Sequence, residues 1–266
     1  MFGDNTEEEI YIREVETENP KLIKTKQLKR NIMADEQLLD NEDEIARTKI
    51  YKAGNAKIHK LCETADRKYI LSEYRDEVSP EYLAAVVEQQ KILHRLYPSR
   101  FVVDIYRGRV GSDGKARYVA TFIDNIDPVK SLNISGPGWQ GEQSANYIAA
   151  VLSSEEFKAQ LPDMERIGLI PHDENSSGGP YTNELAGNTM YDSTGHQIMV
   201  DVLDPYIKYI ASDGEWKVRP SLDIGEIAQV AKEKGVEDEI ADSLKAYKKY
   251  SEEVVSQYLV DIGGNK

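Results

Sequence analysis

The stretch of sequence that decides the interpretation of this chain is Tyr181–Asp204, which reads YTNELAGNTMYDSTGHQIMVDVLD. The turn-forming run DSTG, at residues 192–195, separates two short segments, and the second contains the apolar run IMV. This pattern predicts a hairpin whose second strand delivers Asp201. Asn188 stands before the first strand, so an amide and a carboxylate would lie at the facing ends of the hairpin. Such groups supply the hard oxygen ligands that magnesium prefers.

Upstream of this stretch, the chain alternates between strand and helix patterns. A helix is predicted to begin at Pro80, with Ser79 as its N-cap, and to run to about Leu96, where Pro98 ends it. Short runs of strand type surround this helix, at residues 48–52, 57–62, 68–75, 101–107 and 117–124. Three strands, a helix and two strands would make one compact lobe.

The rest of the chain is organised around helices. A stretch rich in Pro, Gly and Ser, at residues 125–140, is typical of a hinge or domain boundary. Beyond it we expect helices, with residues 188–204 as the one extended interruption. These helices are predicted at residues 144–152, 155–167, 222–234 and 236–259. The first 46 residues are highly charged and lack an apolar period, which predicts a solvated, flexible leader.

The spacing within Tyr181–Asp204 resembles the catalytic loop and metal-binding turn of protein kinases. Asn188 follows Asn183 by five residues, and Asp201 follows Asn188 by thirteen. The Gly-Asn pair that ends at Asn188 is more similar to aminoglycoside phosphotransferases and related small-molecule kinases, as is Asp204, three residues after Asp201. The resemblance covers these 24 residues and the order of the predicted elements around them.

This resemblance implies an α+β, two-lobed protein-kinase-like fold. The small N-lobe, at residues 47–126, would hold antiparallel strands and one helix, and the mainly helical C-lobe would span residues 127–266. ATP and magnesium would bind at the cleft between the lobes. Asn188 and Asp201 would hold the metal ions, with Asp204 as a further ligand. The phosphoryl acceptor, a small molecule or a protein, is left open.

The residue at the catalytic aspartate position departs from the family pattern, because it is Asn183. An amide orients a hydroxyl group but accepts no proton at neutral pH, so Asn183 cannot be the general base. The run IPHDEN offers an alternative, in which Asp173 follows an apolar stretch as the catalytic aspartate of the family does. The competing interpretation of HDEN is a polar surface turn, and the two alignments stay open.

The predicted small lobe also lacks the ion pair of the family. Ser72 stands where the strand lysine is expected, and Gln89 where the helix glutamate is expected, in the middle of an apolar helix face. Lys68 lies on the same strand face as Ser72 and is a candidate for the missing lysine. Two lysines of the neighbouring strand are alternatives to it: Lys57 and Lys60. Gly54 is the only glycine in the candidate phosphate-covering loop, YKAGNAK.

Composition narrows the class of protein. The chain has 266 residues and a formal net charge of −14, which argues against a nucleic-acid-binding surface. Its single cysteine, Cys62, excludes an intrachain disulfide framework, and no apolar run is long enough to span a bilayer. The charged N-terminus does not resemble a secretory signal. We therefore expect a cytoplasmic protein without nucleic-acid or membrane partners, with signal-independent secretion left open.

Three functions agree with the sequence. The first is a divergent phosphotransferase, or a related nucleotidyltransferase, that uses ATP and magnesium. The second is a pseudokinase acting as a regulatory or binding module, since Ser72, Gln89 and Asn183 each lose a charge that catalysis uses. The third is an unrelated α+β interaction protein, in which Asp192–Gly195 is a simple turn and Asp201–Pro205 caps the next element. We favour the first by a narrow margin.

Overall fold

The computed structural model describes most of the chain from Ile50 onward. The described residues are 50–53, 56–63, 68–100, 105–121, 142–171, 179–191, 195–199, 204–210, 214 and 216–263. They belong to one compact unit that spans Thr48–Lys266. The predicted leader, at residues 1–46, and the predicted lobe boundary, at residues 126 and 127, lie outside the described residues, so both stay predictions.

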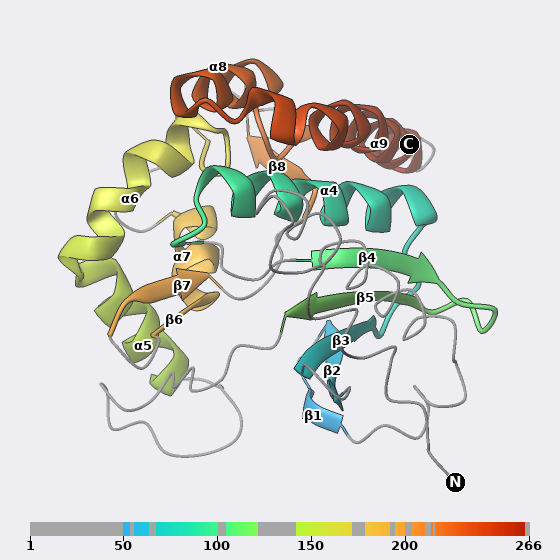
Figure 1. The fold of residues 1–266 in the computed structure, drawn as a ribbon, viewed down its shortest axis with the longest axis horizontal. Helices are drawn as coiled ribbons and strands as arrows, with labels where there is room; N and C mark the ends of the chain where they lie inside the picture. The colour runs from blue at the N-terminus through green and yellow to red at the C-terminus, as the bar shows by residue number, and fades with distance from the viewer. Residues whose placement is uncertain are drawn as a thin grey trace, which may run out of the picture. The chain divides into compact units, whose positions relative to one another are not determined.

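A five-stranded antiparallel sheet forms the first part of this unit (Figure 1). Its order is β1-β2-β3-β5-β4, and each neighbouring pair of strands is antiparallel. Helix α4 lies between β3 and β4 in the chain, so the predicted order of three strands, one helix and two strands is confirmed. The elements are β1 (Ile50–Ala53), β2 (Lys57–Glu63), β3 (Lys68–Tyr74), α4 (Pro80–Leu96), β4 (Ile105–Val110) and β5 (Ala116–Thr121).

Helix α4 begins and ends where its sequence predicts. The Ser79 side chain caps the helix by accepting a hydrogen bond from the Tyr82 backbone N–H at 3.1 Å, and Pro80 occupies the first turn. At the other end, the Tyr97 backbone N–H donates to the Leu93 carbonyl, immediately before a proline. Local signals are therefore sufficient to set both ends of this helix.

The second part of the unit is mainly helical, and the predicted helices are confirmed to within a few residues. They are α5 (Glu142–Ser153), α6 (Glu155–Arg166), α8 (Ile224–Lys234) and α9 (Glu237–Gly263). The predicted hairpin is also present, as β6 (Thr189–Tyr191) paired antiparallel with β7 (Gln197–Met199). The unit is thus an α+β fold. Among the helices that the structure describes, none is long and apolar enough to cross a bilayer.

Two further elements are missing from the sequence prediction. One is helix α7 (Pro180–Gly187), which begins without a side-chain cap, so that Pro180 in its first turn is the main local signal. The other is a hairpin of β8 (Tyr206–Ile210) and β9 (Trp216–Pro220), which the alternating run YIKYI and the turn residues SDG could have revealed. Residues 181–187, which the resemblance aligned with a catalytic loop, are therefore helical, and residues 188–204 are not the one extended interruption.

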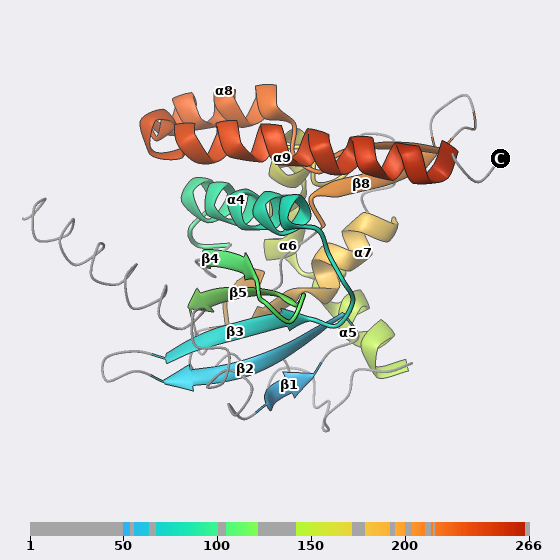
Figure 2. The ribbon, with the colours of Figure 1, turned by 90° about the vertical axis from the view of Figure 1, so that its right-hand side faces the viewer.

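Helix α4 lies at the centre of the fold because two of its sides are buried. One side packs on the sheet, where Gly108 of β4 allows close approach: a Cβ atom at Gly108 would lie 2.8 Å from Val87 Cγ2 and 3.0 Å from Leu83 Cγ. The other side packs against α9, so α4 lies between the sheet and α9 in both views (Figure 1, Figure 2). The sequence pattern predicts one apolar stripe, and the contact with α9 adds the second.

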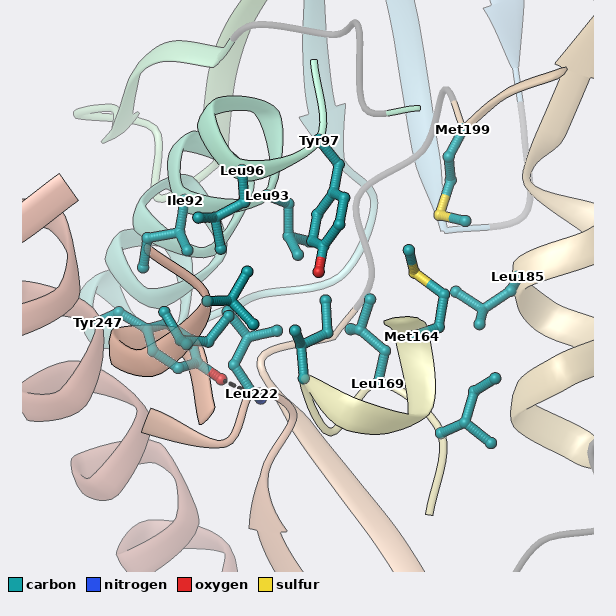
Figure 3. Close-up of a cluster of buried hydrophobic side chains, with 14 of the residues drawn as sticks. Ile92, Leu93, Leu96, Tyr97, Met164, Leu169, Leu185, Met199, Leu222 and Tyr247 are labelled. Atoms are coloured by element: carbon teal, nitrogen blue, oxygen red, sulfur yellow. Dashed lines mark hydrogen bonds between the residues drawn. The ribbon is translucent and has the colours of Figure 1, made fainter. Parts of the chain in front are cut away.

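The larger apolar core joins α4 to the helical part of the unit (Figure 3). Ile92, Leu93 and Leu96 of α4 belong to the same cluster as Leu222 and Tyr247. The Tyr247 side chain is fully buried, and its hydroxyl oxygen accepts a hydrogen bond from the Leu222 backbone N–H at 2.9 Å. The Tyr247 hydroxyl also donates to the Pro205 carbonyl at 3.3 Å, and this bond ties the residue just before β8 to α9.

Candidate functional site

The β6–β7 hairpin presents Asn188 at its open end. Thr189 pairs with Met199, and Asn188 is the residue just before this pair, at the C-cap of α7 with its side chain half-buried. Two hydrogen bonds hold Thr189: its hydroxyl donates to the Leu185 carbonyl at 2.8 Å, and its carbonyl accepts from the Tyr147 hydroxyl. The Met199 N–H donates to a backbone carbonyl outside the hairpin at 2.7 Å. Asn188 therefore stands at a well-anchored position.

Asn183 lies within helix α7, five residues before Asn188. At 3.6 residues per turn, this spacing separates the two side-chain directions by about 140° around the helix. They consequently do not project from one face of α7. The structure does not bring these two predicted site residues together in the way that an extended catalytic loop would.

Asp204 is held by contacts from α4 and from the residue that follows β9. The Tyr82 hydroxyl donates a hydrogen bond to Asp204 Oδ1. The Asp204 backbone carbonyl accepts from the Ser221 hydroxyl and, at 3.5 Å, from Gln89 Nε2. Gln89 is fully buried, and this contact gives its amide nitrogen an acceptor. Among the described residues, nothing donates to Asp204 Oδ2.

Two phenols beside Asp204 are held in their neutral form. Burial and the negative charge of Asp204 raise the pKa of Tyr82 above its ordinary value. The same two causes, in the same order, raise the pKa of Tyr206. Both hydroxyl groups therefore keep their protons at neutral pH, and Tyr82 is available as a hydrogen-bond donor to the carboxylate.

A pocket of about 210 Å³ lies beside Asp204. Helix α7 and strand β8 contribute most of its lining: Tyr181, Glu184, Leu185, Tyr206, Ile207 and Lys208. The Tyr181 hydroxyl donates to the Lys208 carbonyl and so ties α7 to β8. The pocket combines apolar side chains with two carboxylates and one ammonium group, and its volume suits a small ligand or part of a larger one.

The register of the sheet separates the candidate lysines. Lys57 pairs with Tyr74 and His59 with Ser72, so Lys57 shares the sheet face of Ser72, the face that packs on α4. Lys68 also belongs to this face by alternation, and its side chain is exposed. Lys60 lies on the opposite face, where its ammonium is 3.9 Å from Glu73 Oε2.

The Ser72 side chain is buried and lies 2.8 Å from the His59 ring nitrogen Nδ1. The residue that the resemblance aligns with the family lysine is therefore a hydroxyl that already has a partner.

Three predicted site residues lie outside the described residues: Gly54, Asp173 and Asp201. Within the described ranges, no group of three His, Cys, Asp or Glu side chains could hold a metal ion. A scan of protein-family models finds none that matches the chain, and a search of curated proteins finds no match either. The candidate site therefore depends on geometry and chemistry alone.

The sequence interpretation overlooks the tyrosines of this site. Tyr82, Tyr181 and Tyr206 all lie within reach of Asp204 or its pocket. Their signal is compositional, since the chain has sixteen tyrosines against four phenylalanines. The hydroxyl of a half-buried tyrosine normally has a polar partner. The excess of tyrosine over phenylalanine therefore indicated such contacts, but not which residues make them.

Proposed function

We propose that this chain is a divergent kinase-like phosphotransferase that binds ATP and magnesium between a sheet-containing N-lobe and a helical C-lobe. The order of the elements carries the proposal. The sheet order is β1-β2-β3-β5-β4, α4 follows β3, and a later hairpin begins directly after Asn188. Kinases hold metal ions through an asparagine of the catalytic loop and a later aspartate. Asn188 and Asp201 occupy the corresponding sequence positions.

Magnesium would be held by oxygen atoms of Asn188, Asp201 and Asp204. When bound, it would neutralise charge on the transferred phosphate. Asp204 fits this role, since Tyr82 occupies Oδ1 and Oδ2 remains without a hydrogen-bond donor among the described residues. Asn188 fits as well, because its side chain offers an amide oxygen at an anchored hairpin end.

The phosphate-binding cation would come from the sheet face that carries Ser72. Lys68 and Lys57 both lie on this face, whereas Lys60 is engaged with Glu73 on the other. Gly54 stands between β1 and β2 in the sequence, and it would belong to the loop that covers the phosphates. A cytoplasmic location, which we propose from the single cysteine, would supply both ATP and magnesium.

Asp173 is the better candidate for the general base. The helical conformation of α7 removes Asn183 from an extended loop, and an amide accepts no proton at neutral pH. In this assignment α7 is an insertion between Asp173 and Asn188. The acceptor would use the pocket beside Asp204, which α7 helps to form.

A pseudokinase is the second candidate, and the surroundings of Gln89 favour it. Gln89 is neutral and is engaged with the Asp204 backbone, so no carboxylate on α4 is available there to position a strand lysine. A protein of this kind would bind nucleotide without transferring phosphate. An unrelated interaction protein is the remaining alternative, and it would bind no nucleotide.

The test measures nucleotide binding and group transfer separately. Thermal unfolding with ATP, with and without magnesium, should show a metal-dependent rise in melting temperature. Transfer of label from γ-labelled ATP supports the phosphotransferase, and transfer from α-labelled ATP supports the nucleotidyltransferase. Binding without transfer supports the pseudokinase, and the absence of metal-dependent stabilisation refutes the main proposal.

Variants of the candidate residues sharpen this test. Asp201→Asn should abolish transfer, whereas Asp242→Asn, at an exposed position of α9, should leave it unchanged. Asp173→Ala should reduce transfer more than Asn183→Ala does. The opposite order would return the acceptor role to Asn183.

A further inference from the structure

The pocket beside Asp204 is lined by three neighbouring side chains with different hydrogen-bonding chemistry. Tyr206 and Lys208 alternate along β8 and so share one of its sides, and Asp204 stands just before this strand. Together they offer a carboxylate that accepts, a phenol that donates or accepts, and an ammonium group that donates. Glu184 of α7 adds a second carboxylate to the lining. The pocket is therefore neither purely anionic nor purely cationic.

These three side chains are held by contacts with residues around them. The Tyr82 hydroxyl donates to Asp204 Oδ1. The Tyr206 ring lies 6.3 Å from the Tyr82 ring and stacks on the Tyr258 ring at 5.3 Å, between centroids. The Lys208 ammonium lies 4.1 Å from the centroid of the Tyr258 ring. Groups that are already fixed lose little further freedom when a ligand binds, so these contacts preorganise the pocket.

Each of the three side chains retains capacity for a further hydrogen bond. Among the described residues, nothing donates to Asp204 Oδ2, and none forms a hydrogen bond with the Tyr206 hydroxyl. The Lys208 ammonium has three N–H donors and forms no ion pair with any residue that the structure describes. Burial and the charge of Asp204 raise the pKa of Tyr206, so its hydroxyl keeps its proton at neutral pH.

We propose that this pocket binds a small, neutral molecule with several hydroxyl groups, of the sugar or cyclitol class, through Asp204, Tyr206 and Lys208. A hydroxyl group both donates and accepts, so one such ligand can donate to the carboxylate and accept from the phenol and the ammonium. Apolar side chains of the lining, such as Ile207, would contact its C–H groups. An ionic ligand fits less well, because a cation would meet Lys208 and an anion would meet Asp204 and Glu184.

The assignment rests on the proposed function where it names the acceptor, because one hydroxyl of this ligand would receive the phosphoryl group. The oxygen of that hydroxyl would form a bond to the γ-phosphorus of ATP, and the bond from this phosphorus to the departing ADP would break. The hydroxyl proton would pass to the general base. Asp204 Oδ2 has two lone pairs, so a ligand hydroxyl and the proposed magnesium ion can share it. Binding of the ligand itself needs neither nucleotide nor metal.

The test measures binding of D-glucose, D-ribose and myo-inositol by saturation-transfer difference NMR, without ATP or metal. Putrescine and L-alanine serve as the cationic and the zwitterionic comparison. Tyr206→Phe keeps the ring contacts and removes the hydroxyl, whereas Asp204→Asn keeps the side-chain shape and removes its charge. Tyr250→Phe, at a half-buried tyrosine of α9 that does not line the pocket, is the matched control. Thermal unfolding of each variant sets a temperature at which all of them are folded.

We expect at least one of the three hydroxyl-rich probes to bind the wild-type chain. Its dissociation constant should rise about 3- to 10-fold in Tyr206→Phe and about 10-fold in Asp204→Asn, and should stay unchanged in Tyr250→Phe. The inference is overturned if none of these three probes binds, if only putrescine or L-alanine binds, or if all variants bind equally well.

Failure of this inference can be distinguished from failure of the proposed function. If a hydroxyl-rich probe binds as expected and ATP gives no metal-dependent stabilisation, the pocket assignment stands and the proposed function fails. If label passes from ATP to another acceptor while none of the three probes binds, the proposed function stands and the pocket assignment fails.

Discussion

Replacing Glu73 by glutamine should destabilise the protein, because Glu73 is a buried anion that three cations share. Glu73 lies on β3 and is 3% exposed. Its carboxylate lies 2.8 Å from Arg117 Nε, 3.0 Å from Lys115 Nζ and 3.9 Å from Lys60 Nζ. Arg117 and Lys60 are themselves buried, so removing the negative charge leaves two cations in a poorly hydrated place.

The expected loss at pH 7 is about 2 to 4 kcal/mol. Removing one partner of a buried ion pair typically costs about 3–5 kcal/mol. The cost is smaller here because Arg117 keeps its hydrogen bond to Asp113 at 3.0 Å, and the glutamine oxygen can still accept one hydrogen bond. For a unit of this size, the melting temperature should fall by roughly 5 to 15 °C.

The effect of Glu73→Gln should depend on pH. Burial raises the pKa of Glu73, but hydrogen bonds from Lys115 and Arg117 outweigh it, so the pKa lies below the ordinary value of 4.5. A lowered pKa in the folded state stabilises the protein above the pKa of the unfolded chain, and this contribution is lost as pH falls through the folded pKa. Glutamine does not titrate, so the stability gap between wild type and variant should narrow below about pH 4.

Urea unfolding followed by circular dichroism at pH 7 and at pH 3 measures this gap. Glu77→Gln is the matched control, because Glu77 is an exposed carboxylate in the loop after β3. Its variant should stay within about 0.5 kcal/mol of wild type. A gap below that value for Glu73→Gln at pH 7, or a gap that does not change on acidification, would refute the reasoning.

Two further predictions concern packing around α4. Tyr247→Phe removes the acceptor of the buried Leu222 N–H and should lower the free energy of unfolding in urea by about 1–3 kcal/mol. The control Tyr250→Phe should lower it by less. Equal losses in the two variants would show that the Leu222 N–H finds another acceptor. Gly108→Ala should destabilise by about 1–3 kcal/mol, because its Cβ would lie 2.8 Å from Val87 Cγ2. Adding Val87→Ala should relieve the clash. If the double variant loses as much stability as the two single variants together, the clash with Val87 is not the cause.

Much of the fold was predictable because its signals are local. Ser79 and Pro80 set the start of α4, and the turn at residues 192–195 indicated the β6–β7 hairpin. Helix α7 escaped prediction because no side chain caps its N-terminus. The pairing of β3 with β5 is not encoded in any short run either, since α4 and β4 intervene between the two strands.

The candidate site was likewise predictable from the sequence only in part. The resemblance to kinase motifs singled out Asn188 and Asp204, and the amphipathic pattern of α4 singled out Gln89. The pairing of Tyr82 with Asp204 joins residues 122 positions apart, and no periodicity of sequence indicates it. The separation of Lys57 from Lys60 onto opposite sheet faces likewise required the register of β2 against β3.

The sequence by itself determined the caps of α4, the hairpin turn and the residue types available for the proposed metal–nucleotide site, because these depend on interactions within a few residues. Tertiary structure decided which of those residues meet. Burial of apolar surface is not directional, so the packing of α4 between the sheet and α9 is set by the whole core. That packing brings Tyr82 and Gln89 to Asp204, and it makes this contact the most specific feature of the candidate site.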